Sequence, residues 1–464
     1  MDILLIYPHV STSIIEEGVR VPPLGLAYLA AVLAGKGYKV NILDMNAQPK
    51  LALQFKDILQ QERPKIVGIT CLTPFYSTVL SLAKTAKELI NATVITGGAH
   101  ATALPEEMLK SKTIDYVVMG EGEAIMAELA DSLLLGKGSP EEIKGIAYIK
   151  DGKPCRNNQH DYIENLDELP FPARHLLPIE RYQSPQYQQS RVTSIVTSRG
   201  CPYSCIFCDY RFLMGPKFRR RSPENVVREI EECIQKYHVK HISFRDSTFT
   251  YDEKWISDLC KFIKQRALKI EWDCNGRVNL VTKRMLDEMR NAGCSLISYG
   301  IESGDQTILN FADKNLTTEQ SSNAMQMTKK LGIQTLSYFI IGLPGENWET
   351  IKKTIDFARK LDSDYTQFSL ATPFPGTPLY EYAKERNLIR PGVTWDDFSP
   401  INKAIMRTEA LDFEELEKAL KRAYKSYYLR PKYIIKRALK LRPSNIKQNF
   451  TGLKMFARQQ AAGY

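Results

Sequence analysis

The chain has 464 residues, of which 43% are hydrophobic and 25% are charged, and this composition excludes a disordered or fibrous protein. No run of eighteen apolar residues occurs, so the sequence predicts no hydrophobic membrane-spanning helix. The net charge is +10, but residues 421–464 contain twelve Lys or Arg and no acidic residue, which leaves the remaining residues close to neutral. The length predicts two to four domains.

The N-terminal segment MDILLIYPHV lacks the basic leader and cleavage site of a signal peptide, so we expect an intracellular, cytoplasmic protein. Its nine cysteines should then be reduced. An odd number of thiols in a reducing compartment favours metal ligands and buried core residues over a disulfide framework.

Strand-like and helical patterns alternate along the first 130 residues. Such alternation predicts a parallel sheet with covering helices, whose ligands lie beyond the carboxyl ends of the strands. We interpret residues 1–137 as this first α/β domain. The expected strands are 3–7, 40–43, 66–70, 94–96 and 116–119, and helices are expected at 24–33 and 77–89.

Residues 138–190 are rich in Pro, Gln and Tyr, which is typical of a connecting segment. A second series of strands and helices follows and predicts a partial or complete barrel over residues 191–385, with its chemistry at the C-terminal strand ends. The expected strands are 193–197, 241–244, 270–273, 296–299, 335–340 and 365–370. Residues 386–464 are predicted to be basic and mainly helical.

Three cysteines follow the first expected barrel strand at the spacing CxxxCxxC: Cys201, Cys205 and Cys208. Thiols this close can bind one soft-metal centre. Zinc sites usually have two CxxC pairs or Cys with His, although zinc with a remote fourth ligand and a chance group of buried thiols remain alternatives. A cubane iron–sulfur cluster normally takes four thiolates, so three would leave one iron open.

This loop resembles that of the radical S-adenosylmethionine (SAM) enzymes, in which SAM binds the open iron of a [4Fe-4S] cluster. The resemblance continues in the segments FRDSTF, NGRV, YGIESG and FIIGLPGE, each after a later strand. It implies a partial (β/α)6 barrel. The SAM-binding residues that it implies are Tyr203, Phe207, Asp246, Ser247, Arg277, Glu302, Ser303, Gly342 and Pro344.

The chemistry of three of these segments suits parts of SAM. Arg277 offers a planar fork for a carboxylate, and Glu302 can accept a hydrogen bond from an ammonium or a ribose hydroxyl. The backbone of residues 342–345 can approach an adenine edge. Ion pairing at the barrel rim is the alternative role for the charged residues, and the segment around Asp246 matches the family's looser motif least well.

The α/β domain before such a barrel resembles the Rossmann-like domain of the cobalamin-binding subgroup, through its PPLGL and GGAH segments. The DxHxxG motif that supplies a cobalt ligand in many cobalamin proteins is absent. His9 and His100 are candidate ligands, although hydrogen-bonding or surface roles are commoner for a loop histidine. The cobalamin-binding residues that the resemblance implies are Pro8, Leu24, Gly25, Thr70, Cys71, Leu72, Thr73, Gly97, Gly98, Ala99, His100, Gly120, Glu121, Gly122 and Glu123.

The resemblance implies a C-methyltransferase that uses a 5′-deoxyadenosyl radical and methylcobalamin to methylate an unactivated carbon. Non-methylating chemistry is the alternative, because anaerobic oxidative cyclases of tetrapyrrole synthesis and ring-contracting enzymes resemble the same architecture. A cluster-bearing sensor would leave the SAM-like strand ends unexplained. No residue is assigned as catalytic, and the substrate, whether a small molecule, a lipid or a peptide, is not specified by any motif.

A flavodoxin or ferredoxin is the expected electron donor, and a monomer is the expected state. The basic C-terminal segment mixes Lys and Arg with aromatic residues such as Tyr427 and Tyr428. This mixture is compatible with weak contact with an anionic surface, but the stronger interpretation is a helix that packs on the barrel and turns its lysines to water.

Overall fold

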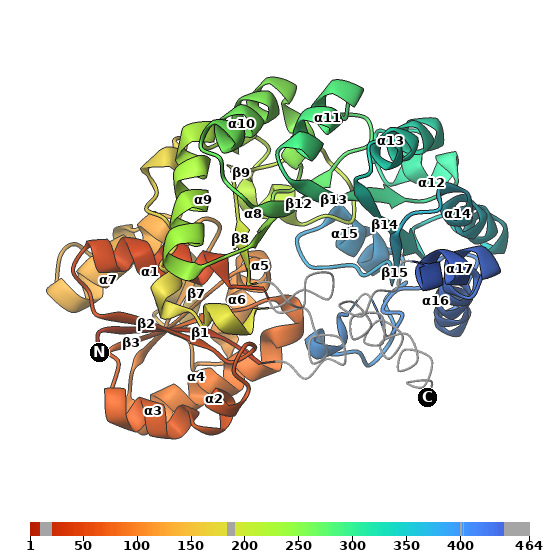
Figure 1. Cartoon of the computed structure of the whole chain (residues 1–464). Coiled ribbons are helices and arrows are strands. Elements are labelled where there is room, and N and C mark those ends of the chain that lie inside the picture. Colours follow the sequence, from red (N-terminus) through yellow and green to blue (C-terminus); the bar gives the residue numbers. More distant parts are fainter. Residues whose placement is uncertain (10–20, 183–190, 400, 402, 440–464) are drawn as a thin grey trace. The chain divides into compact units, whose positions relative to one another are not determined.

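The computed structural model describes the chain except residues 10–20, 183–190, 400, 402 and 440–464 (Figure 1). The chain forms two compact units. Unit 1 comprises Met1–Tyr182 and Asp209–Arg220, and unit 2 comprises Gln183–Cys208 and Arg221–Tyr464. The chain therefore passes from unit 2 into unit 1 directly after Cys208 and returns after Arg220.

Unit 1 contains a seven-stranded sheet in the order β2-β1-β3-β4-β5-β6-β7. The first five strands in this order are parallel, which confirms the predicted parallel sheet, while β6 and β7 are antiparallel additions. The strands are β1 Ile3–Tyr7, β2 Val40–Asp44, β3 Ile66–Thr70, β4 Thr93–Gly97, β5 Tyr116–Val118, β6 Ile146–Lys150 and β7 Lys153–Arg156.

Helices cover both faces of this sheet, with α1 and α7 on one face and α3 and α4 on the other (Figure 1). The strands are almost fully apolar because both faces are buried; Leu4, Val67 and Val94 have no exposed surface. The helices are α1 Leu24–Gly35, α2 Lys50–Leu53, α3 Phe55–Glu62, α4 Tyr76–Ile90, α5 Ala99–Ala103, α6 Pro105–Lys110, α7 Gly122–Leu135 and α8 Tyr210–Met214.

The segment that follows residue 137 adds to unit 1. It supplies β6 and β7, and the hydroxyl of Tyr182 donates a hydrogen bond to the buried carboxylate of Asp44 at 2.7 Å. Residues 183–190, with Pro185, lie outside the described residues. The segment that its Pro and Gln content predicts to be a connector therefore also contains the β6–β7 hairpin at the edge of the first sheet.

Unit 2 contains a six-stranded parallel sheet in the order β15-β14-β13-β12-β11-β8. Because β8 and β15 are the two ends of this order, the described strands form an open, partial barrel as predicted. The strands are β8 Val192–Ile195, β11 His241–Phe244, β12 Glu271–Gly276, β13 Cys294–Glu302, β14 Gln334–Ile341 and β15 Tyr365–Leu370, and the short strands are β9 Ser198–Arg199 and β10 Arg219–Arg220.

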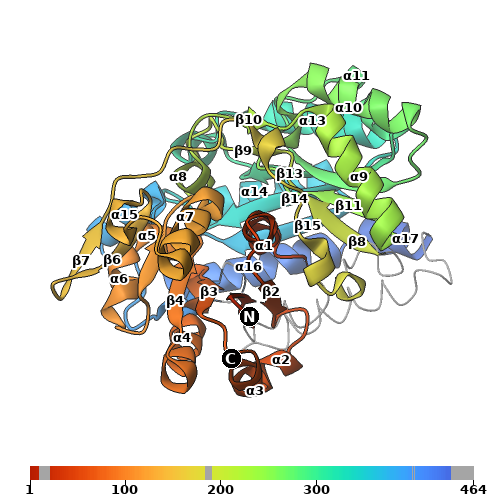
Figure 2. The same ribbon diagram turned by 90° about the vertical axis from the view of Figure 1, so that its left-hand side faces the viewer.

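Helices connect the parallel strands and lie along one face of the sheet (Figure 2). Many begin at a capping side chain: Ser222, Asp252 and Thr317 each accept a hydrogen bond from a backbone N–H of the first turn. The helices are α9 Pro223–Tyr237, α10 Glu253–Gln265, α11 Lys283–Asn291, α12 Gln306–Phe311, α13 Thr318–Lys330, α14 Trp348–Leu361, α15 Pro378–Glu385, α16 Phe413–Tyr428 and α17 Pro431–Leu439.

Two tyrosines of α16 form hydrogen bonds with backbone N–H and C=O groups on the outer edge of strand β15. The hydroxyl of Tyr428 accepts from Thr366 N at 3.0 Å and donates to its carbonyl oxygen, and Tyr424 does the same for Phe368. Unpaired edge groups would otherwise require another strand or water. The helical prediction for the C-terminal region is therefore confirmed through α17, while residues 440–464 lie outside the described part of the chain.

No helix in the described part of the chain combines the length and the apolar character needed to cross a bilayer.

Candidate active site

The cysteine loop follows β8 and β9 at the carboxyl end of the unit 2 sheet. Two other segments fix its backbone, because Ile206 N donates to Ala312 O at 3.2 Å and its carbonyl accepts from Leu379 N at 2.9 Å. Phe207 packs against an apolar cluster that includes Leu343. The structure thus anchors the loop between the end of α12 and the start of α15.

The three cysteines of this loop are free thiols; Cys201 and Cys205 are half-buried, and Cys208 is exposed. In the part of the chain that the structure describes, no three His, Cys, Asp or Glu side chains are grouped so that they could hold one metal ion. The donor set itself fits an iron–sulfur cluster, because three thiolates on one accessible loop are soft ligands that leave a fourth position open.

Arg277 lies directly beside the cysteine loop. Its guanidinium carbon is 3.5 Å from the centre of the Tyr203 ring, and Nη1 lies 3.9 Å from the Sγ atom of Cys205. Nη2 donates to the carbonyl oxygen of Lys314, and Nε donates to Asn279. Two of the predicted SAM residues, Tyr203 and Arg277, are therefore in contact with each other and with the loop.

Glu302 forms a nearly buried ion pair at the end of β13. Its Oε1 atom accepts from Lys314 Nζ at 2.6 Å, and both side chains are less than a tenth exposed. Glu302 has a left-handed φ of 65° at a register shift in the strand. A side chain at Gly300 would collide with both partners, which explains the small residue there.

Lys314 is a site residue that the sequence analysis missed. Its ammonium lies 5.7 Å from the centre of the Phe207 ring, and its backbone holds Arg277. It therefore joins the cysteine loop to Glu302. The surrounding sequence, ADKNL, contains no recognisable motif, so only the fold brings this cation to the site.

Asp246 and Ser247 support the start of the cysteine loop. Asp246 is fully buried, and its Oδ1 atom accepts from Thr197 N and Thr197 Oγ1 at 2.9 Å and from Ser198 Oγ. The hydroxyl of Ser247 donates to Gly200 O at 3.4 Å. These contacts order the backbone immediately before Cys201, and the predicted SAM contacts of both residues stay predictions.

The segment after β14 contains a buried carboxyl group. Glu346 Oε2 accepts from the backbone N–H groups of Gly342 at 2.5 Å and Leu343 at 3.2 Å. Burial raises the pKa of Glu346 to about 8, although these two donors lower it. Glu346 thus shapes the Gly342–Pro344 backbone, a role that the GLPGE motif could have indicated.

Ser303, another predicted SAM residue, is fully buried in the same unit. Its hydroxyl lies 3.0 Å from that of Thr354 and accepts from the backbone N–H of Asp305 at 3.1 Å. These contacts fix the turn after β13, and a direct contact of Ser303 with SAM stays a prediction.

In unit 1, the predicted cobalamin residues lie after β1, β3, β4 and β5, at the carboxyl end of the parallel sheet. Gly98 has φ +100°, and a Cβ there would lie 2.9 Å from Cys71 O and 3.0 Å from Thr70 Oγ1. Gly97 also lies close to a neighbouring strand, since a Cβ added there would be 3.2 Å from Val118 O. Glycine at these two positions therefore allows the neighbouring strand ends to pack closely.

His100 is buried within unit 1 and is 1% exposed. Its Nδ1 atom lies 3.3 Å from Thr73 Oγ1, and its ring contacts Tyr76 edge-on at 5.2 Å. Cys71 is also buried, with its thiol 3.6 Å from Leu72 O. These contacts give both residues a packing role. A cobalt-ligand role for His100, and likewise for His9, stays a prediction.

Glu121 forms a buried ion pair with Arg219, at 2.8 and 3.0 Å from Nη1 to the two carboxylate oxygens. Arg219 also donates to Ile163 O and Met214 O, and its guanidinium lies over the Tyr162 ring. This network fastens residues 209–220, which follow the cysteine loop directly, within unit 1. The predicted contact of Glu121 with cobalamin stays a prediction.

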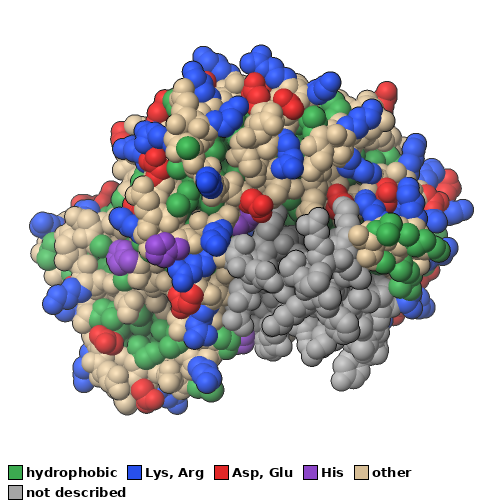
Figure 3. All heavy atoms as spheres, in the orientation of Figure 1, with side chains coloured by type: hydrophobic (Ala, Val, Ile, Leu, Met, Phe, Trp, Pro, Cys, Tyr) green, Lys and Arg blue, Asp and Glu red, His purple; other side chains and the backbone are tan. Residues whose placement is uncertain are grey.

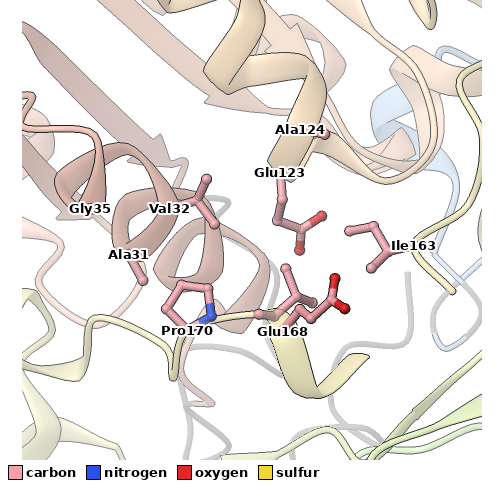
Figure 4. A pocket seen from close by; sticks show the side chains of 9 residues that line it. Ala31, Val32, Gly35, Glu123, Ala124, Ile163, Glu168 and Pro170 are labelled. Atoms are coloured by element: carbon pink, nitrogen blue, oxygen red, sulfur yellow. The ribbon is translucent and has the colours of Figure 1, made fainter. Parts of the chain in front are cut away.

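A shallow cavity of about 370 Å³ lies in unit 1 beside α1 and the start of α7. Figure 4 shows the carboxylates of Glu123 and Glu168 directed into it, with Val32 and Pro170 among its apolar walls. Glu123 is the one predicted cobalamin residue on its surface. The predicted glycine loops do not line it.

Comparison with known proteins identifies both units. The radical SAM superfamily model matches residues 195–358, and the B12 binding domain model matches residues 12–130. Together these matches mark the class of radical SAM enzymes that carry a B12-binding domain.

Similar relatives have the same arrangement over nearly the whole chain. An uncharacterized methyltransferase of Pyrococcus horikoshii is 38% identical over 98% of both chains. The anaerobic magnesium-protoporphyrin IX monomethyl ester cyclase of Rubrivivax gelatinosus is 30% identical over 94% of this chain and 78% of its own. The protein therefore belongs to the cobalamin-dependent radical SAM family, and its cofactors are a [4Fe-4S] cluster, SAM and cobalamin.

Solved structures agree on the fold. The radical SAM methyltransferase TsrM from Kitasatospora setae, with cobalamin and a [4Fe-4S] cluster bound, superposes with a TM-score of 0.72 at 22% identity and covers 88% of this chain and 83% of its own. OxsB with aqua-cobalamin bound has a TM-score of 0.77 at 17% identity, over 99% and 71% of the two chains. At this identity the likeness supports the two-unit fold alone.

Proposed function

We propose that this protein is a cobalamin-dependent radical SAM C-methyltransferase that methylates an unactivated carbon of a small-molecule substrate. The observation that carries this proposal is the three-thiol loop at the carboxyl end of a radical SAM barrel in a chain that also has a B12-binding domain. The methyltransferase relative from Pyrococcus, which matches end to end, favours methyl transfer.

When bound, the three cofactors supply one-electron cleavage of SAM and methyl transfer. Cys201, Cys205 and Cys208 would hold the cluster. The residues beside them would orient SAM: Arg277 and Lys314 are cations suited to its carboxylate, and Glu302 is an acceptor for its ammonium.

The remaining predicted SAM residues would form the walls of this site or order the turns that carry it. Tyr203 and Phe207 offer apolar ring surface, and the Gly342–Pro344 backbone, fixed by Glu346, would lie along the adenine. Asp246, Ser247 and Ser303 would act by ordering the turns that carry the site.

In unit 1, the strand-end loops would hold cobalamin. Thr70, Gly97, Gly98 and Gly120 present backbone and small side chains that a flat macrocycle can approach closely. The other members of this set are Pro8, Leu24, Gly25, Cys71, Leu72, Thr73, Ala99, His100, Glu121, Gly122 and Glu123.

Anaerobic turnover tests the proposal. Protein reconstituted with iron, sulfide and cobalamin should convert SAM to 5′-deoxyadenosine and S-adenosylhomocysteine in the presence of substrate. Cys205→Ala should remove the cluster and both products, whereas the half-buried Cys155, far along the chain in β7, offers the matched control Cys155→Ala with unchanged iron content. Turnover that requires no cluster would contradict the proposal.

Oxidative cyclisation is the second candidate, because the cyclase of Rubrivivax is 30% identical over most of the chain. The product ratio distinguishes the two. S-adenosylhomocysteine formed together with 5′-deoxyadenosine indicates methylation, whereas 5′-deoxyadenosine alone indicates another radical reaction.

We further infer a cytoplasmic monomer that receives electrons from a flavodoxin or a ferredoxin. Contact of the C-terminal helix with an anionic surface is also proposed. It is supported by exposed Leu429, Ile434, Ile435 and Leu439 on and beside α17, in a segment without acidic residues (Figure 3). Ion pairs of Arg430 and Lys436 with Asp362 and Asp364 tie the same helix to the barrel.

A further inference from the structure

One face of the unit 2 sheet is covered by helices, and the opposite face, here called the open face, carries polar side chains together with the half-exposed Leu336 and Ile340. In β14 and β15 the buried residues alternate with half-exposed ones, as expected for a sheet covered on one side. Strand register places the half-exposed residues on one face. The half-exposed polar residues of the open face are Asp273, Asn275, Tyr338, Gln367 and Ser369.

Most charged or hydroxyl groups on the open face already have partners. The carboxylate of Asp273 binds His241 Nε2 at 2.7 Å and Ser243 Oγ at 2.6 Å, so both of its oxygens are engaged. Burial raises the pKa of the Tyr338 hydroxyl, which is hydrogen-bonded to Ser298 and stays neutral. These side chains are therefore held by hydrogen bonds within the unit.

Arg245 differs from its neighbours. Its backbone N–H donates to Ile195 O at 2.9 Å, so the ladder between β8 and β11 continues to Arg245, and the alternation of His241 and Ser243 places its side chain on the open face. Its positive charge also lowers the pKa of Tyr338. It is exposed. Within the described residues its guanidinium makes no hydrogen bond or ion pair.

The other cations near the cysteine loop are already engaged. Arg277 donates to Lys314 O and Asn279 and lies over Tyr203, while the Lys314 ammonium is paired with Glu302. Arg245, in contrast to Arg277 and Lys314, has no side-chain partner among the described residues. A guanidinium presents a planar fork that binds carboxylate or phosphonate groups through two hydrogen bonds.

We propose that the open face binds a polar substrate that carries an anionic group, and that Arg245 pairs with this group. This proposal rests on the proposed function in one respect: it takes the open face to be the side of the barrel on which the substrate lies. His241 and Ser243 already hold the carboxylate of Asp273 on this face, whereas the exposed guanidinium of Arg245 offers donors to which an anionic group can bind.

The test uses holoenzyme saturated with SAM, so that the predicted SAM cations are occupied. Methylphosphonate serves as the anionic probe and its neutral dimethyl ester as the matched control, with binding measured by anaerobic calorimetry. We expect the wild type to bind methylphosphonate with a Kd on the order of millimolar and to bind the ester far more weakly. Arg245→Gln should weaken methylphosphonate binding roughly tenfold or more.

Two variants complete the design. Arg245→Lys should restore part of the affinity, and Arg266→Gln, which removes an exposed arginine paired with Glu231 on the same unit, should leave it unchanged. Unaltered SAM binding shows that Arg245→Gln is folded. Equal affinity in Arg245→Gln and wild type, no binding of methylphosphonate by wild type, or preference for the neutral ester would overturn the proposal. This experiment measures binding and not turnover. Its failure can therefore be distinguished from failure of the proposed methyltransferase activity, which is tested by product formation.

Discussion

The strand ends of the two units are built in opposite ways. In unit 1 the ends of β3 and β4 consist of glycines, small side chains and the packed residues His100 and Cys71, while the end of β5 carries Glu121, which pairs with Arg219. In unit 2 they carry charges, with Arg277 stacked on Tyr203 and a nearly buried ion pair between Glu302 and Lys314. The comparison shows that close backbone packing shapes the ends of β3 and β4 in unit 1, whereas ion pairing and stacking of charged side chains shape the strand ends of unit 2.

The largest expected effect comes from removing charge in unit 2. Lys314→Ala leaves Glu302 nearly buried without its cation, which for buried pairs costs about 3–5 kcal/mol. We expect SAM affinity to fall by roughly a hundredfold or more, measured by anaerobic equilibrium dialysis. Cobalamin content should not change.

The matched control for this variant is Lys353→Ala, which removes a half-exposed ion pair with Asp305 in the same unit. Surface pairs of this kind contribute less than about 1 kcal/mol. Comparable loss of SAM affinity in both lysine variants would show that charge at the strand end has no special role.

A smaller effect is expected from adding bulk in unit 1. Gly98→Ala places a Cβ 2.9 Å from Cys71 O at a φ of +100°, so the loop must shift or strain by roughly 1–3 kcal/mol. We expect reduced cobalt per chain and a weaker corrinoid absorbance, with SAM binding retained.

Gly152→Ala is the control for backbone strain, because Gly152 also has a positive φ but open space around it. If both glycine variants retained cobalamin equally, close backbone approach would not govern this edge.

The last prediction concerns the stability of the fold, not ligand binding, and rests on the pKa of Glu346. Its pKa is about 8 in the folded chain, above the ordinary value of 4.5, because burial disfavours the charged form. The folded state then holds a proton that the unfolded state has released. This contribution to stability is complete below pH 4.5 and is lost as the pH rises through 8.

Glu346→Gln keeps an acceptor for the N–H groups of Gly342 and Leu343 but does not titrate. Its free energy of unfolding, from denaturant titrations between pH 5 and 8, should fall less steeply than that of the wild type by about 1.4 kcal/mol per pH unit. Parallel curves for the two proteins would show that Glu346 is ionised in the fold.

Local pattern was sufficient for most strands. The ranges Ile3–Tyr7, Ile66–Thr70, His241–Phe244 and Tyr365–Leu370 agree residue for residue with the structure. Short apolar runs bounded by turn residues have few alternative placements. The predicted length of β13 was too short, since the strand extends from Cys294 to Glu302 and includes a Gly and a charged residue, which are not typical of strands. Pairing with two neighbouring strands supplies the stabilisation there.

The amino-acid sequence by itself determined the two α/β units, the three-thiol loop and the strand-end motifs, because these depend on periodicity and on residues adjacent in the chain. Only the tertiary structure decided that Lys314 pairs with Glu302, that Arg219 neutralises Glu121 and that Arg245 has no partner among the described residues. Charge pairing depends on distance in space, and the fold sets that distance between residues up to 98 positions apart.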